Sequence, residues 1–145
     1  GQTSGQIRVR FFRDAEGARG IHLLCGINDI AEIGGPVPDR EIAANILAMG
    51  RLAFEAGLPL WIGTVMPSDF WGWRPELRPV ARIRVLNGWL RSLCDAGAAR
   101  LIDYQTPLAD ASGALARGFT EDGIHLNAAG YAAIEPAMLR ALVPG

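Results

Sequence analysis

The chain has 145 residues, of which 50% are hydrophobic and 20% are charged, and this length suits one compact domain. Fourteen basic and fifteen acidic side chains leave a net charge of -1, so no basic excess is present to neutralise nucleic-acid phosphates. The apolar content excludes a disordered chain. The longest apolar runs are about half the roughly 20 residues of a membrane-spanning helix. We therefore expect a single globular domain over residues 1–145 that neither binds nucleic acid nor spans a membrane.

The first predicted elements alternate between helix and strand. Residues 3–6 have the form of a helix capping box, which favours an opening helix, although residues 7–11 also alternate as a strand would. Short continuous apolar runs at residues 21–25, 58–65 and 100–104 predict three strands. Continuous runs of this kind are typical of parallel strands that are buried on both faces.

Three further helices are expected between and after these strands. Asp39 is the predicted N-cap of the first. The second has Pro79 in its first turn and stops at Gly97. The third opens at Asn127, and Pro136 is expected to kink or break it. The alternation predicts an α/β fold with a parallel sheet, whose ligands bind beyond the carboxyl ends of the strands.

Two polar groups lie where such a site is expected. Asn28 comes just after the first strand, where its amide can point two donors into a crevice, or else bond to neighbouring backbone. Asp122 precedes His125 by three positions, so the carboxylate can hold one ring nitrogen and leave the other as a general base. A surface cap and a partly buried histidine would give the same pattern. Together the groups are the oxyanion-stabilising and general-base parts of acyl-transfer chemistry, without a nucleophile.

The same segments resemble the SGNH, or GDSL-type, hydrolases. Gly26-Ile27-Asn28-Asp29 looks like the third conserved block, and residues 122–131 look like the fifth block. The opening Gly1-Gln2-Thr3 is similar to the end of the second block. The resemblance implies a three-layer α/β/α, flavodoxin-like fold and hydrolysis of a carboxylic ester. It assigns Asp122 and His125 to the catalytic triad and Asn28 and Gly1 to the oxyanion hole.

The sequence departs from the family's pattern at the nucleophile. The first block, a Gly-Asp-Ser, does not occur in these residues. We therefore expect a fragment that lacks the N-terminal strands and is inactive by itself. Ser68 follows a predicted strand and is a weaker candidate nucleophile, because it also reads as an ordinary turn residue. The alternative function is a non-catalytic relative that has lost its serine and binds an ester or a glycan.

The aromatic loop after the second strand is a candidate substrate contact. Trp71 and Trp73 are predicted to touch an acyl or sugar group, and a lid packed over the core is an equal alternative. His22, within an apolar strand, is predicted to be a buried core histidine, and Cys25 and Cys94 to be packing residues.

No cofactor is expected, because no metal-ligand spacing and no glycine-rich phosphate loop is found. The implied partner is a small ester, such as an acylated sugar or a lipid. Members of this kind are often exported, so the resemblance fits a periplasmic or secreted protein. The sequence itself indicates neither the compartment nor the oligomeric state.

Overall fold

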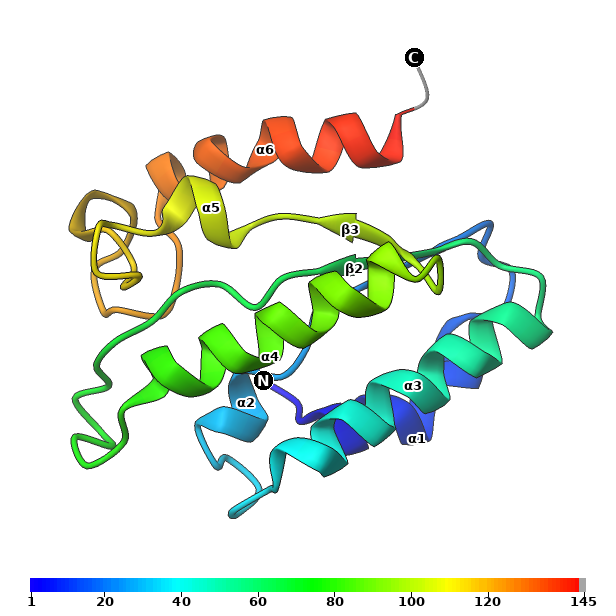
Figure 1. Cartoon of the computed structure of the whole chain (residues 1–145), viewed down its shortest axis with the longest axis horizontal. Coiled ribbons are helices and arrows are strands. Elements are labelled where there is room, and N and C mark those ends of the chain that lie inside the picture. The colour runs from blue at the N-terminus through cyan, green and yellow to red at the C-terminus, as the bar shows by residue number, and fades with distance from the viewer. Residues whose placement is uncertain (144–145) are drawn as a thin grey trace.

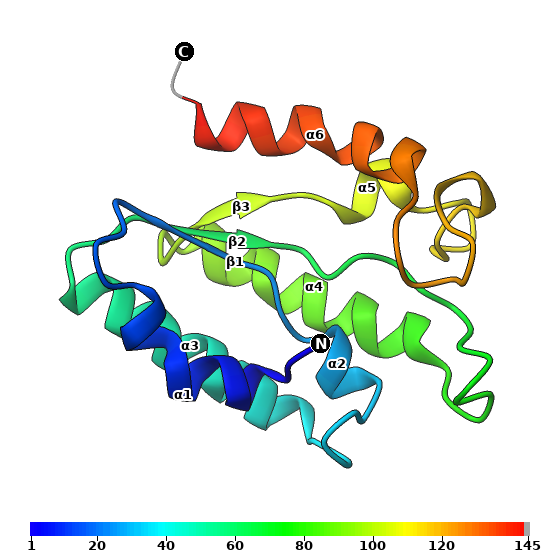
Figure 2. The same cartoon turned by 180° about the vertical axis from the view of Figure 1, so that it is seen from behind.

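The computed structural model describes residues 1–143 and is built on a three-stranded parallel sheet. The strands stand in the order β1 (Ile21–Leu23), β2 (Leu60–Gly63) and β3 (Arg100–Ile102). Helices α1 (Ser4–Asp14), α3 (Asp39–Glu55) and α4 (Pro79–Asp95) lie on one face of the sheet, and α6 (Ala128–Leu142) lies on the other (Figures 1 and 2). Three short helices occupy the connections: α2 (Ile27–Ile30), α5 (Gln105–Leu108) and the 3-10 helix η1 (Arg117–Phe119). The predicted three-layer α/β arrangement is confirmed.

Helix α1 forms because its cap satisfies two backbone N–H groups at once. The Thr3 hydroxyl accepts a hydrogen bond from the Gln6 backbone N–H, and the Gln6 side chain accepts one from the Thr3 backbone N–H at 3.0 Å. Ile7 and Phe11 then fall on one side of the helix and pack against the core. The helical interpretation of this segment is confirmed over the strand-like alternation.

The helices differ from the predicted ones in two details, the cap of α3 and the absence of a restart at Pro136. Pro38, and not Asp39, is the N-cap of α3, and the Asp39 carboxylate instead pairs with the Arg82 guanidinium at 2.6 Å. Pro136 does not break α6, which is continuous. The proline removes the N–H that would bond to the Ala132 carbonyl, and both residues are exposed, so that carbonyl can be solvated by water.

The buried apolar side chains form two clusters. The larger core lies between the sheet and helices α1, α3 and α4, and its most enclosed members include Ile42, Met49 and Ile83. The smaller core consists of Leu108, Leu115 and Leu126, with flanking residues from α6 and η1. Within residues 1–143 no helix is both long enough and apolar enough to cross a membrane.

Strand β1 is buried on one face only. Leu23 belongs to the larger core, but His22 is exposed and Leu24 is 38% exposed on the opposite face. Helix α6 covers the neighbouring β2 there, where the Trp61 indole donates to the Ala141 carbonyl at 2.8 Å, and no described element covers β1. The predicted burial of this run on both faces, and of His22 in the core, is therefore wrong. The second edge of β1 also has no strand partner among the described residues.

Candidate active site

Asp122 and His125 lie in the loop between η1 and α6 and contact each other directly. Asp122 Oδ2 is 2.6 Å from His125 Nδ1, and Oδ1 accepts the backbone N–H groups of Ile124 and His125 at 2.9 and 2.8 Å. The pKa of Asp122 lies well below its usual range. The main cause is the hydrogen bond from the His125 side chain, and the two backbone N–H groups add to it. When Nδ1–H donates to this carboxylate, Nε2 keeps its lone pair and can act as a base.

Thr120 closes the same loop and was missed by the sequence analysis. Its hydroxyl accepts the Gly123 N–H at 3.0 Å and donates to the His125 carbonyl at 2.8 Å. An isolated antiparallel bridge between Thr120 and Leu126 joins the two ends of the loop. A threonine two residues before an aspartate is a local side-chain-to-backbone signal that would have indicated this arrangement.

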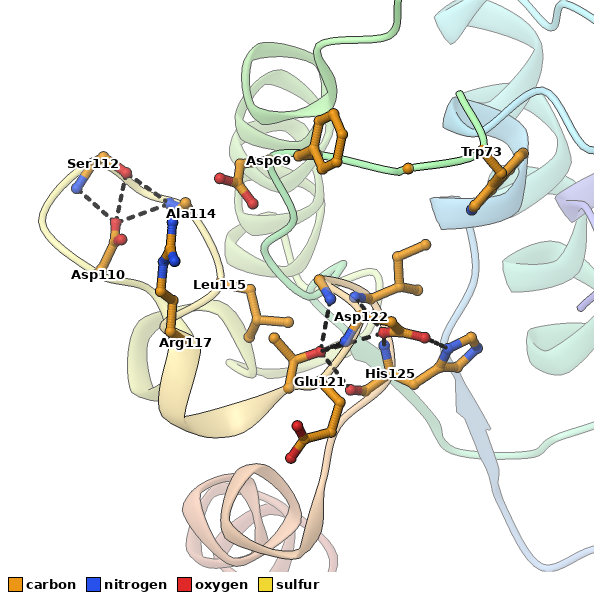
Figure 3. Close-up of a pocket in the computed structure, with 15 residues that line it drawn as sticks. Asp69, Trp73, Asp110, Ser112, Ala114, Leu115, Arg117, Glu121, Asp122 and His125 are labelled. Atoms are coloured by element: carbon orange, nitrogen blue, oxygen red, sulfur yellow. Dashed lines mark hydrogen bonds and ion pairs between the residues drawn. The ribbon is translucent and has the colours of Figure 1, made fainter. Parts of the chain in front are cut away.

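The pair is open to solvent and borders a cavity. The side chains of His125 and Asp122 are 82% and 52% exposed. Figure 3 shows both at the edge of a hollow, with Trp73 on one side and Asp110, Ser112 and Arg117 on another. A substrate can therefore reach Nε2 without any rearrangement of the loop.

Asn28 and Gly1 form a second pair after β1. Gly26 turns the chain there with φ 111°, and a side chain at that position would lie 2.8 Å from Leu86. Asn28 Nδ2 donates one proton to the Gln2 carbonyl at 3.0 Å, which leaves its second N–H without a partner among the described residues. A Cβ at Gly1 would come within 2.2 Å of Asn28 Nδ2. The two predicted oxyanion donors are thus neighbours, and the site requires glycine at position 1.

A buried carboxylate beside Asn28 fixes this second pair. Asp29 is 1% exposed and accepts the Ser4 backbone N–H at 2.8 Å and the Ser4 hydroxyl at 2.7 Å. The Ser4 hydroxyl in turn accepts from Asn45 Nδ2 at 3.0 Å. This chain of bonds ties α1, α2 and α3 together, and it satisfies a charge that would otherwise be costly to bury. No local pattern in the sequence points to it.

The two pairs lie at the same end of the sheet and share no hydrogen bond among the described residues. Ile27, which precedes Asn28, and Ile124, which precedes His125, both pack against the larger core. Both loops lie beyond the carboxyl ends of the strands (Figure 1). The cavity beside His125 is lined by neither Asn28 nor Gly1. The structure thus joins Asp122 to His125 and Gly1 to Asn28, with no direct bond between the pairs.

The two tryptophans differ in their exposure. Trp71 is fully buried, and its indole N–H donates to the Ser68 hydroxyl at 2.7 Å. Trp73 is 52% exposed, lines the cavity and stacks on Trp71 with ring centroids 5.9 Å apart. A buried Trp71 cannot contact a substrate in this arrangement, and it packs over the core as the alternative prediction states. The predicted substrate contact therefore depends on Trp73 alone.

None of the four serine hydroxyls in the chain donates to His125. Ser68 is 1% exposed and gives its proton to the Gly123 carbonyl at 2.7 Å, so it holds the Asp122 loop in place. Ser4 donates to Asp29, Ser92 donates to the Gly88 carbonyl, and Ser112 donates to Asp110. Ser68 therefore ties the turn after β2 to the Asp122 loop. The described residues contain no group of three or more His, Cys, Asp or Glu side chains that could hold a metal ion.

Comparison with known proteins gives a family and a fold. A profile for the GDSL-like lipase/acylhydrolase family matches residues 1–133. A solved structure of a candidate acylhydrolase from Bacteroides fragilis is 28% identical, with a TM-score of 0.92 over 97% of this chain and 69% of that chain. A GDSL-like lipase from Bacteroides thetaiotaomicron is 27% identical, with a TM-score of 0.92 over 97% of this chain and 70% of that chain.

More distant structures share the fold. An acetylxylan esterase from Geobacillus stearothermophilus has a TM-score of 0.79 at 15% identity, over 99% of this chain and 69% of that chain. Among curated proteins no relative matches the sequence. On the family match and the fold, the chain belongs to the GDSL-like lipase/acylhydrolase family.

Proposed function

We propose that this chain carries the general base and the oxyanion donors of a serine carboxylic-ester hydrolase. The observation that carries the proposal is the 2.6 Å contact between Asp122 and His125 Nδ1, which leaves Nε2 open to solvent. Family membership and the likeness to solved acylhydrolases support a hydrolase in general terms.

In this mechanism His125 Nε2 takes the proton of a serine as that serine attacks the ester carbonyl. Asp122 stabilises the imidazolium that forms, and the Asn28 amide and the Gly1 N–H stabilise the oxyanion. His125 then protonates the departing alkoxide, and water hydrolyses the acyl-serine by the same route in reverse. General-base assistance contributes roughly 100- to 10,000-fold and one oxyanion donor roughly 100- to 1,000-fold.

We infer that the attacking serine lies outside residues 1–145. Two observations support this inference. All four serine hydroxyls of the chain are committed to other acceptors, as described above. Among the described residues, strand β1 has no partner along its second edge, which leaves room for a further strand beside it.

Covalent labelling tests the proposal. A fluorophosphonate probe should label one serine of the gene's full product, and peptide mapping should find that serine outside residues 1–145. His125→Ala should abolish the labelling, whereas Phe54→Ala, at an exposed position on α3, should leave it unchanged. Labelling of Ser68 or of any other serine within the chain would contradict the inference about the nucleophile.

The alternative is a family member that binds an ester or a glycan without hydrolysing it. The lack of an activated serine among the described residues is the observation that favours it. If the full gene product takes up no fluorophosphonate and hydrolyses no p-nitrophenyl acetate, this alternative replaces the hydrolase.

A further inference from the structure

Residues 68–76, which we call the bridging loop, belong to the connection from β2 to α4 and contact both halves of the candidate site. Near its start the bridging loop bonds to the base loop, residues 120–126, which contains Asp122 and His125. Near its end it bonds to the turn that follows α2 and Asn28. The two pairs share no hydrogen bond with each other, so this loop is a bonded connection between them.

The contact with the base loop is buried and close. Ser68 is 1% exposed, and its hydroxyl donates to the Gly123 carbonyl at 2.7 Å while it accepts the Trp71 indole N–H at 2.7 Å. Gly123 has φ 83°, and a Cβ at this position would lie 2.9 Å from the Phe70 carbonyl oxygen. The two loops thus touch backbone to backbone two residues before His125, and a shift of the bridging loop must displace the base loop.

The contact on the Asn28 side holds a strained residue. Glu32 is the one non-glycine residue within residues 1–143 that has a positive φ, 54°, a conformation that persists only where the surroundings hold it. Its carboxylate pairs with the Arg74 guanidinium at 2.7 Å, and both side chains are largely covered. The Glu32 N–H donates to the Asp29 carbonyl, and the Ile33 N–H donates to the Asn28 carbonyl, both at 3.0 Å. The ion pair therefore acts on the turn that directly supports Asn28.

Between these two contacts the bridging loop is rigid. Trp71 is fully buried, and Trp73 stacks on it with an interplanar angle of 14°. The Arg74 N–H donates to the Trp71 carbonyl at 2.9 Å and closes the turn between them. In Figure 3 the loop runs from Asp69 past the base loop to Trp73. A packed segment that is bonded near both ends keeps the two loops that it joins in a fixed relation.

We propose that the bridging loop sets the position of the His125 base relative to the Asn28 oxyanion donor, with Ser68 and Arg74 as positioning residues. Both catalytic groups must act on one ester carbonyl, and a misplacement of about 1 Å can cost on the order of 100-fold in rate. Because this relation matters in the transition state, its loss lowers kcat and leaves KM nearly unchanged. The inference rests on the proposed hydrolase, since it concerns the geometry of that reaction.

Variants of the ion pair in the full gene product test the proposal. Glu32→Gln should lower kcat for p-nitrophenyl acetate by about fivefold or more and change KM by less than about twofold. Glu32→Arg combined with Arg74→Glu reverses the pair and should return kcat to within about twofold of the unmodified protein. Asp39→Asn, which removes the charge from the ion pair between α3 and α4, is the matched control and should leave kcat unchanged.

A combined variant tests whether the two contacts act as one unit. Ser68→Ala alone should also lower kcat by about fivefold or more. Adding Glu32→Gln to it should slow the reaction by no more than about a further twofold, because a loop released near one end no longer fixes the relation. Losses that multiply would show two independent local effects and overturn the proposal. If Ser68→Ala fails to fold, Glu32→Gln and the reversed pair decide the question.

The proton NMR signal of the His125 ring separates this proposal from the hydrolase. The signal, identified by its loss in His125→Ala, should shift in Glu32→Gln, return in the reversed pair and stay in place in Asp39→Asn. An unmoved signal or an unchanged kcat in Glu32→Gln, or a reversed pair as slow as Glu32→Gln, overturns the role of the bridging loop. If the signal shifts as expected but the unmodified full gene product hydrolyses no ester, only the hydrolase fails.

Discussion

Two carboxylates of the candidate site are held in opposite ways. Asp29 is 1% exposed, and its partners come from Ser4, 25 residues away on another helix. Asp122 is about half exposed, and its partners all lie within three residues. The oxyanion side of the site thus depends on tertiary packing, whereas the base side depends on the geometry of one loop. A buried carboxylate with distant partners stabilises the fold, whereas an exposed carboxylate with local partners is available for chemistry.

The largest expected effect tests the base side. His125→Ala should lower kcat/KM of the full gene product by roughly 100- to 10,000-fold, because the proton acceptor is lost. Its free energy of unfolding should change by less than about 0.5 kcal/mol, since the side chain is 82% exposed. Ester hydrolysis and a denaturant titration measure the two quantities. A destabilised His125→Ala variant with normal kcat/KM would show that His125 stabilises the fold and is not the base.

Asp29→Ala should show the opposite pattern on the oxyanion side. The substitution leaves the Ser4 N–H and hydroxyl without their acceptor in a buried place, so we expect a loss of about 2 to 4 kcal/mol of stability. Thermal or urea unfolding followed by circular dichroism gives this number. Asp39→Ala, which removes a half-exposed surface ion pair, is the matched control and should cost less than about 1 kcal/mol. Equal losses of stability in the two variants would show that Asp29 contributes no more to stability than a surface ion pair does.

Gly1→Ala sharpens the comparison without touching a charge. The added Cβ would lie 2.2 Å from Asn28 Nδ2, so the amide must turn away and its bond to the Gln2 carbonyl must break. We expect kcat/KM to fall by about 10- to 100-fold, somewhat less than for loss of a whole oxyanion donor. Gly88→Ala, within α4, provides a control, because its Cβ would meet nothing within 4 Å and its backbone is not in the left-handed region. Unchanged kcat/KM in Gly1→Ala would separate residue 1 from the oxyanion hole.

The smallest expected effect concerns the hydroxyl that closes the base loop. Thr120→Val removes the acceptor of the Gly123 N–H and the donor to the His125 carbonyl, so kcat should fall by about tenfold with KM little changed. Thr120→Ser should restore the rate. Because Asp122 has a pKa well below its usual range, it stays ionised where an ordinary aspartate titrates, and the acid limb of the rate profile should not report its titration. An unchanged kcat in Thr120→Val would show that the hydroxyl has no role in positioning the loop.

The features that local sequence determines were predictable. The capping box at Thr3 and the Asn127 cap, whose side chain accepts from the Gly130 N–H at 3.1 Å, each depend on residues three positions apart. The contact between Asp122 and His125 is equally local. These are the cases in which the residues alone specify the geometry.

The features that the sequence left open, missed or mispredicted depend on distant partners. Trp71 is buried because Ser68 binds its indole and Gly123, 55 residues further on, binds Ser68. His22 is exposed because no described element covers β1, which no pattern within the strand reveals. The Asp29 bonds depend on how α1 and α3 pack. Patterns within one segment predict that segment's form but not which of its faces the rest of the chain covers.

The division into two cores has a consequence for inactivation. Leu126, which directly follows His125, belongs to the smaller core, whereas the residues around Asn28 are anchored by the larger one. A local opening that releases α6 would free the His125 end of the base loop, although Ile124 and the Ser68–Gly123 bond hold its other end, and would leave the sheet and α1, α3 and α4 assembled. Amide protons of α6 would then exchange faster than those of α3, and activity would disappear at a denaturant concentration that leaves most of the circular dichroism intact.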